Sequence, residues 1–148
     1  MSHGIFSLKP GEYAPDFTLP CSTDKSIHLY DLLKSGRVLL GFADDIWSVN
    51  SVRRVLWLQR HMLKLATSNI WAVFVAPNDQ DDLRSFERSI PRDLPFAIVA
   101  DADGAVSAQY GFVKSLGFLL IGRDNKLKRV WLGNEGMPAT RDLMLLSE

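Results

Sequence analysis

The strongest constraint on the fold is a regular alternation of short apolar runs with longer amphipathic segments. Three runs are typical of strands buried on both faces: Arg37–Ala43, Ile70–Ala76 and Pro95–Ala100. Helices are predicted between them, over Ser48–Ala66 and from Asn78 or Asp79 to about Ser89. Because strands joined by helical crossovers run parallel, this order predicts a mainly parallel central sheet with helices on both faces.

Further elements are expected on both sides of this framework. Ahead of it, Asp16–Leu19 and Ser26–Leu29 are typical of a small β-hairpin. The sequence shows no internal repeat and no linker long enough to separate domains, so we expect residues 1–148 to form a single domain. After the third strand, the pattern predicts two helices, at Ala105–Tyr110 and Thr140–Leu146. It also predicts two strands, Phe118–Ile121 and Leu127–Leu132, joined by the turn Arg-Asp-Asn-Lys.

Charge and composition narrow the classes of function. The 148 residues are 47% hydrophobic, which is enough for one core. Lys and Arg number 17, as do Asp and Glu, and a chain without excess positive charge is a poor general binder of nucleic acid or anionic membranes. No apolar run reaches the length of a signal peptide or a membrane-spanning helix. We therefore expect a cytoplasmic protein that binds neither nucleic acid nor membranes.

The chain has one cysteine, Cys21, which excludes an internal disulfide, a CxxC redox pair and a multi-cysteine metal site. Lone cysteines are often simply buried, and neither a helix start nor a charge partner is evident beside Cys21. We expect a half-buried small residue, with a reactive thiol as the alternative.

Several short motifs, taken in order, resemble those of one family. The motifs are Gly11–Pro20 (GEYAPDFTLP), Leu29–Leu33 (LYDLL), Asp101–Gly104 (DADG) followed by Tyr110-Gly111, and Leu120–Asp124 (LIGRD). Together they resemble the peroxiredoxins of the alkyl hydroperoxide reductase and thiol-specific antioxidant type, over about Lys9 to Gly133. The resemblance implies a thioredoxin-like three-layer α/β/α sandwich with an N-terminal β-hairpin extension.

The resemblance also implies an active site where the first long helix begins. There the family has F-x-P and then T-x-x-C, and this chain has Phe42-Ala-Asp44 and Ser48-Val-Asn-Ser51. Ser51 therefore stands at the position of the peroxide-reacting cysteine, and Ser48 is compatible with the threonine. Asp44 replaces the motif proline. No arginine lies where the family's later active-site arginine would fall, although Lys114 and Ser115 are nearby.

Serine cannot take over the chemistry of that cysteine. A thiol ionises near pH 8.5, and a helix N-terminus lowers its pKa, whereas a serine hydroxyl needs an adjacent base to react. A hydrolase based on Ser51 lacks such a base, since His61 lies ten residues further along the same helix. For Ser48 we favour a role as the helix N-cap.

Binding is the remaining use of this region. Trp47 could anchor a protein partner or a second subunit, or could pack on its own domain, and Asp44 and Lys114 are further candidate binding residues. The basic residues of the helix (Arg53, Arg54, Arg60, His61 and Lys64) are expected to form a solvated face, with an acidic partner as the minority alternative. We expect neither a cofactor nor a metal, although Asp44, Asp45, Asp101 and Asp103 are conceivable metal ligands.

Three hypotheses of function follow. The first is a peroxiredoxin-like protein without redox-active cysteines that is non-catalytic and acts by binding a protein or ligand. The second is a thiol peroxidase or thiol-disulfide oxidoreductase whose active-site cysteine is replaced here by serine. The third is an enzyme with one cysteine that uses Cys21.

Overall fold

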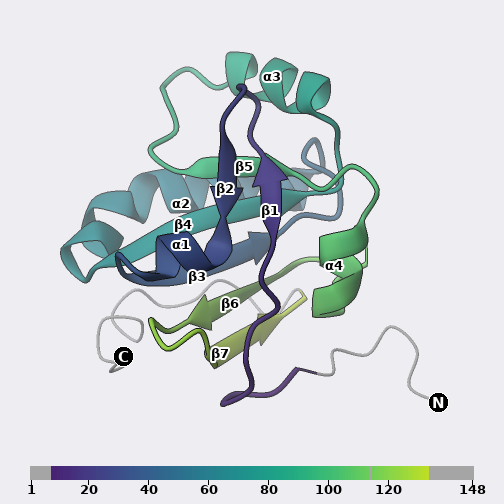
Figure 1. The fold of residues 1–148 in the computed structure, drawn as a ribbon. Coiled ribbons are helices and arrows are strands. Elements are labelled where there is room, and N and C mark those ends of the chain that lie inside the picture. Colours follow the sequence, from purple (N-terminus) through teal and green to yellow (C-terminus); the bar gives the residue numbers. More distant parts are fainter. Residues whose placement is uncertain (1–7, 114, 134–148) are drawn as a thin grey trace.

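A five-stranded sheet forms the centre of the molecule (Figure 1), and the computed structural model describes residues 8–113 and 115–133. Its strand order is β5-β4-β3-β6-β7. Strands β3, β4 and β5 pair in parallel, while β6 pairs antiparallel with β3 and β7 with β6, so the sheet is mixed rather than mainly parallel. The predicted parallel half and the closing antiparallel hairpin are both confirmed. The strands are β3 (Arg37–Phe42), β4 (Ile70–Ala76), β5 (Ala97–Ala100), β6 (Gly117–Ile121) and β7 (Leu127–Leu132).

Helices cover both faces of the sheet, as a three-layer α/β/α arrangement requires. Helices α2 (Val49–Thr67) and α3 (Gln80–Ser89) pack on one face, and α1 (Leu29–Leu33) and α4 (Ala105–Tyr110) pack on the other (Figure 1). Side chains of a strand alternate between the two faces. In β3, Leu39 therefore joins the core beneath α2, while its neighbour Leu40 joins the core on the other side.

The N-terminal hairpin is confirmed as β1 (Thr18–Pro20) and β2 (Ser26–His28), which pair antiparallel. It leads directly into α1, which the sequence pattern did not predict. Five residues are too few to show a helical period, so LYDLL carries no helix signal of its own. The predicted helix at Thr140–Leu146 lies outside the described residues.

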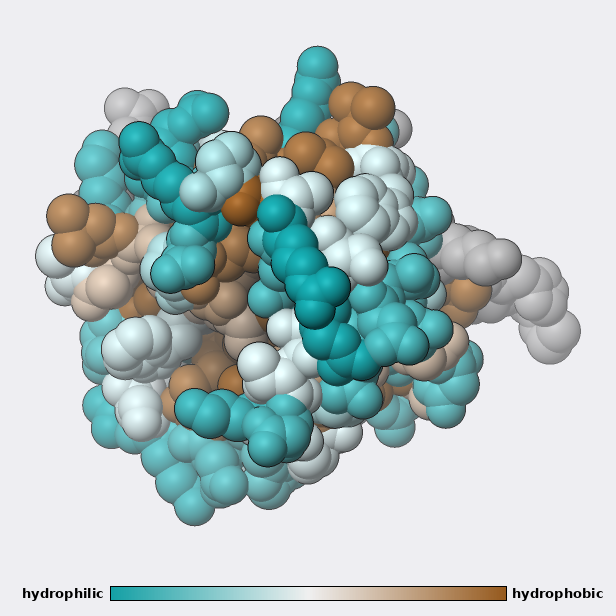
Figure 2. Space-filling view, turned by 90° about the horizontal axis from the view of Figure 1, so that it is seen from above, coloured by the Kyte–Doolittle hydropathy of each residue, from teal (hydrophilic) through white to brown (hydrophobic). Residues whose placement is uncertain are grey.

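Local chemistry sets the element boundaries. Asp79 caps α3, since its side chain accepts a hydrogen bond from the backbone amide of Asp82. Strand β5 begins at Ala97 and not at the predicted Pro95; proline has no backbone N–H to donate to a neighbouring strand. Seen from the side of α3, hydrophobic side chains are exposed between hydrophilic ones, some of them in a hollow (Figure 2).

His28 links the hairpin to α1 and makes that link sensitive to pH. Its Nε2 lies 2.7 Å from Asp16 Oδ2, and its Nδ1 lies 3.0 Å from Asp31 Oδ2. Both carboxylates raise the pKa of His28 above its ordinary value, the hydrogen bond to Asp16 more than the one to Asp31. The contribution of His28 to stability is therefore fully present below its ordinary pKa of about 6.5 and is lost as the pH rises through the raised value.

We expect His28→Gln to lower the melting temperature more at about pH 5.5 than at about pH 9, in thermal unfolding followed by circular dichroism. Lys34→Gln is the matched control, because Lys34 also pairs with Asp31 but its side chain carries no imidazole. An equal effect of His28→Gln at both pH values would contradict the ionic link.

Candidate functional site

The candidate site forms where β3 ends and α2 begins, which is the carboxyl edge of the parallel strands. Ser48 is the N-cap of α2, as predicted, and its Oγ accepts a hydrogen bond of 3.1 Å from the backbone amide of Ser51. Ser51 lies in the first turn and is fully buried. The loop from Ala43 places Asp44 beside both hydroxyl groups. We call Asp44, Ser48 and Ser51 the serine site.

Asp44 is the centre of the serine site. Its Oδ1 accepts hydrogen bonds from Ser48 Oγ at 2.6 Å, Ser51 Oγ at 2.9 Å and the backbone amide of Asp45 at 2.7 Å. Burial raises the pKa of Asp44, but the hydrogen bonds from Ser48, Ser51 and Asp45 together outweigh it and hold the pKa below its ordinary value. A carboxylate anion therefore sits at the N-terminus of α2, where the helix dipole favours negative charge.

Arg54 lies one helical turn beyond Ser51 and is buried, which corrects its expected place on a solvated face. Its guanidinium donates to the carbonyl oxygens of Asn50 at 3.1 Å and Gly133 at 3.0 Å. Burial lowers the pKa of Arg54, and the Asp44 carboxylate opposes that shift.

Trp47 packs on its own domain, which is one of the two alternatives expected from the sequence, and its role as an anchor for a partner stays a prediction. Its ring packs edge-on against Phe86 of α3, with ring centres 5.3 Å apart, yet the residue keeps 47% of its surface exposed. It can therefore offer part of an aromatic ring to a partner. Lys114, the other predicted binding residue, lies outside the described residues.

Cys21 lies away from the serine site. Its backbone forms an isolated antiparallel β-bridge with Val99 of β5, and the residue is half-buried. Burial raises the pKa of its thiol; Glu87 raises it further and Lys25 opposes the shift. A thiol with a raised pKa is mostly protonated near neutral pH, which makes it a weak nucleophile.

Two further candidate residues, His61 and Asp101, are held by hydrogen bonds within the fold. His61 bonds through Nδ1 to the carbonyl oxygen of Trp57 at 2.8 Å, one turn back along α2. Asp101 is buried, and it accepts hydrogen bonds from the amides of Val106 and Ser107 and from Ser107 Oγ, so it holds the start of α4. Within residues 8–113 and 115–133, no three His, Cys, Asp or Glu residues are grouped so that they could hold a metal ion.

The sheet, with its first long helix starting at the end of β3 and a small polar site at that start, defines a thioredoxin-like protein of the peroxiredoxin kind. The chain belongs to the AhpC/TSA family, whose model matches residues 10–132. The described helices include none long and apolar enough to cross a membrane.

Individual relatives agree with this assignment. "Putative peroxiredoxin bcp" of Buchnera aphidicola subsp. Schizaphis graminum is 27% identical over 105 residues, which are 71% of this chain and 65% of that protein, so the match spans a little under two thirds of the relative. Peroxidoxin BcpB from Mycobacterium tuberculosis superposes with a TM-score of 0.83 at 22% identity, over 94% of this chain and 95% of that one.

A third similar protein is named as a thiol:disulfide interchange protein and not as a peroxiredoxin. The "putative Thiol:disulfide interchange protein DsbE" from Chlorobium tepidum has a TM-score of 0.77 at 28% identity, over 93% of this chain and 94% of that one. These likenesses agree with the fold, and membership of the family rests on the family model that matches residues 10–132. The correspondence of Ser51 to the family's cysteine stays a prediction from the motif.

Proposed function

We propose that this protein is a non-catalytic member of its family, which acts by binding a protein or ligand at the surface beside Trp47 and the serine site. The observation that carries the proposal is the Asp44 carboxylate, which accepts hydrogen bonds from both serine hydroxyls at the start of α2.

Asp44 makes this position unsuited to peroxide chemistry of the family's type. That chemistry needs a thiolate, which is favoured by nearby positive charge and disfavoured by nearby negative charge. Here a carboxylate oxygen lies 2.9 Å from Ser51 Oγ. The serine site is thus arranged around an anion of its own, which weighs against the hypothesis of a peroxidase altered only at its cysteine.

The surface above the serine site supports binding. Trp47 offers part of an aromatic ring, Asp45 beside it is exposed, and Val49 in the first turn of α2 is exposed as well. Partly exposed aromatic side chains are common anchors of protein interfaces.

Two measurements test this function. With a thioredoxin system as reductant, we expect no turnover of hydrogen peroxide or cumene hydroperoxide by the wild-type chain. Turnover that Cys21→Ser abolishes would overturn the proposal in favour of the enzyme with one cysteine. Turnover that Cys21→Ser leaves unchanged would also overturn it, by showing catalysis elsewhere.

The binding half is tested by affinity capture with Trp47→Ala as the variant and Trp71→Ala as the matched control, since Trp71 is also partly exposed but lies on β4. We expect a specific set of bound molecules with the wild-type chain and with Trp71→Ala, and its loss with Trp47→Ala. Equal capture by both variants contradicts a role for this surface.

A further inference from the structure

Helix α2 has a second apolar face, which points away from the core. Val49, Leu56 and Leu63 are 71%, 38% and 80% exposed. They are spaced seven residues apart, which is close to two helical turns, so they form one line about 21 Å long on the outside of the helix. We call these three residues the α2 stripe. The opposite side of α2 packs into the core, through Val55 and Leu58 among others.

Positive charge borders the α2 stripe. Arg53, Arg60 and Lys64 are exposed along one side of it. The whole chain has balanced charge, yet Val49–Thr67 contains no acidic residue. Within the described residues, the side chains of Arg53 and Arg60 make no hydrogen bond or ion pair. These cations are therefore available to a partner.

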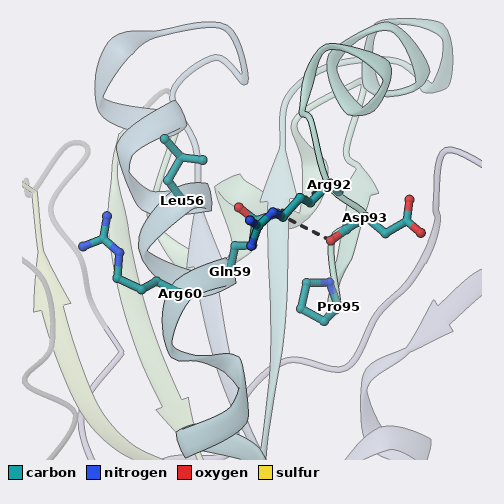
Figure 3. Close-up of a pocket in the computed structure, with 6 residues that line it drawn as sticks. All are labelled: Leu56, Gln59, Arg60, Arg92, Asp93 and Pro95. Atoms are coloured by element: carbon teal, nitrogen blue, oxygen red, sulfur yellow. Dashed lines mark hydrogen bonds between the residues drawn. The ribbon is translucent and has the colours of Figure 1, made fainter.

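A groove of about 440 Å³ runs beside the stripe, between α2 and the segment that leads into β5. Figure 3 shows Leu56 and Arg60 on α2, with Gln59 reaching across to the segment, where its Nε2 meets the carbonyl oxygens of Arg92 at 3.5 Å and Asp93 at 3.4 Å. Arg92 adds a further cation to the lining, and the Asp93 carboxylate points away from α2 (Figure 3).

We propose that the α2 stripe and the adjoining groove dock an amphipathic helix of a partner protein, with an apolar line of its own and acidic residues beside it. Leucine-like side chains of that helix would pack between Val49, Leu56 and Leu63. Its carboxylates would meet Arg53 and Arg60. This surface shares Val49 with the surface beside the serine site but extends from there along α2 to Leu63, so the inference goes beyond the proposed function.

Charge decides between this occupant and a second copy of the chain. If two α2 helices packed through the stripe about a two-fold axis, Arg53 and Arg60 of each would border the same seam, and cations would face cations. A helix suits the surface better than a strand, because helical side chains repeat at the spacing of the stripe and strand addition needs an open sheet edge.

A synthetic peptide tests the proposal: three heptads, with leucine at the first and fourth positions and glutamate at the flanking ones. Its binding to the full chain is measured by fluorescence anisotropy at low and high salt. We expect saturable binding that weakens with salt, and about tenfold weaker binding for Leu63→Ser and for Arg60→Glu. Val113→Ser and Lys9→Glu change an exposed apolar residue and an exposed cation elsewhere, and should bind as the wild type does.

Three results would overturn the proposal. One is the absence of saturable binding. Another is equal binding of the peptide with lysine in place of each glutamate, since the occupant would then not be selected by charge. The last is a wild-type dimer in sedimentation analysis that Leu63→Ser dissociates, because a second copy would then occupy the stripe. Circular dichroism of Leu63→Ser and Arg60→Glu checks that any weakening does not come from unfolding.

Discussion

A cysteine introduced at position 51 is expected to stay inactive towards peroxides unless Asp44 is changed as well. In Ser51→Cys the new thiol would lie against the Asp44 carboxylate, which accepts a hydrogen bond of 2.9 Å from the Ser51 hydroxyl in the present structure. The carboxylate repels a thiolate and accepts a hydrogen bond from the neutral thiol, and both effects raise the thiol pKa. We expect the pKa to be higher by roughly 2 units than in Asp44→Asn/Ser51→Cys, which leaves about a hundredfold less thiolate near neutral pH.

The experiment uses the Cys21→Ser background, so that only one thiol is present. The thiol pKa is obtained from the pH dependence of alkylation by iodoacetamide, and peroxide turnover is measured on the same variants. Asp45→Asn/Ser51→Cys is the matched control, because Asp45 is the neighbouring carboxylate but does not accept from Ser51. Fast turnover by Ser51→Cys alone would contradict the role given to Asp44 and would favour the alternative of a peroxidase that has lost only its cysteine.

The second large effect is expected at Asp101, at the end of β5. Asp101→Ala removes the acceptor of three hydrogen bonds, from the amides of Val106 and Ser107 and from Ser107 Oγ. Each buried donor left without a partner costs about 1–3 kcal/mol, so we expect the free energy of unfolding in urea to fall by about 3 kcal/mol or more.

Asp103→Ala tests the specificity of that effect. Asp103 belongs to the same DADG motif but is exposed and accepts only from the amide of Ala105. Its replacement is expected to cost less than about 1 kcal/mol. If Asp101→Ala does not fold, Asp101→Asn keeps one acceptor oxygen and allows the comparison. Equal losses for Asp101 and Asp103 variants would show that the buried contacts of Asp101 matter less than their geometry indicates.

Much of the fold could be predicted from the sequence because it depends on local pattern. The apolar run Ile70–Ala76 is a strand within those bounds, and Ala105–Tyr110 is a helix within its own. Helix α1 escaped prediction because five residues show no period. The antiparallel pairing of β6 with β3 is a contact between distant segments, and no local pattern encodes it.

The candidate site was predictable in place but not in chemistry. The sequence predicts Ser48 as the N-cap because capping depends on residue type and position alone, and the structure confirms it. The motif indicates that Asp44 replaces a proline and is a candidate binding residue, but its hydrogen bonds with two hydroxyl groups depend on how the loop folds back over the helix. The burial of Arg54 depends on Gly133, which is 79 residues away in the chain.

The contact between Asp44 and Ser51 also bears on how such a chain can evolve. A mutation that places cysteine at position 51 alone would yield a thiol whose neutral form is favoured by the neighbouring carboxylate, so we expect it to add no peroxide chemistry. A change at position 44 alone would remove the acceptor of both serine hydroxyls without adding a nucleophile. If the proposed function holds, positions 44 and 51 would have to change together before a reactive thiolate could form at the start of α2.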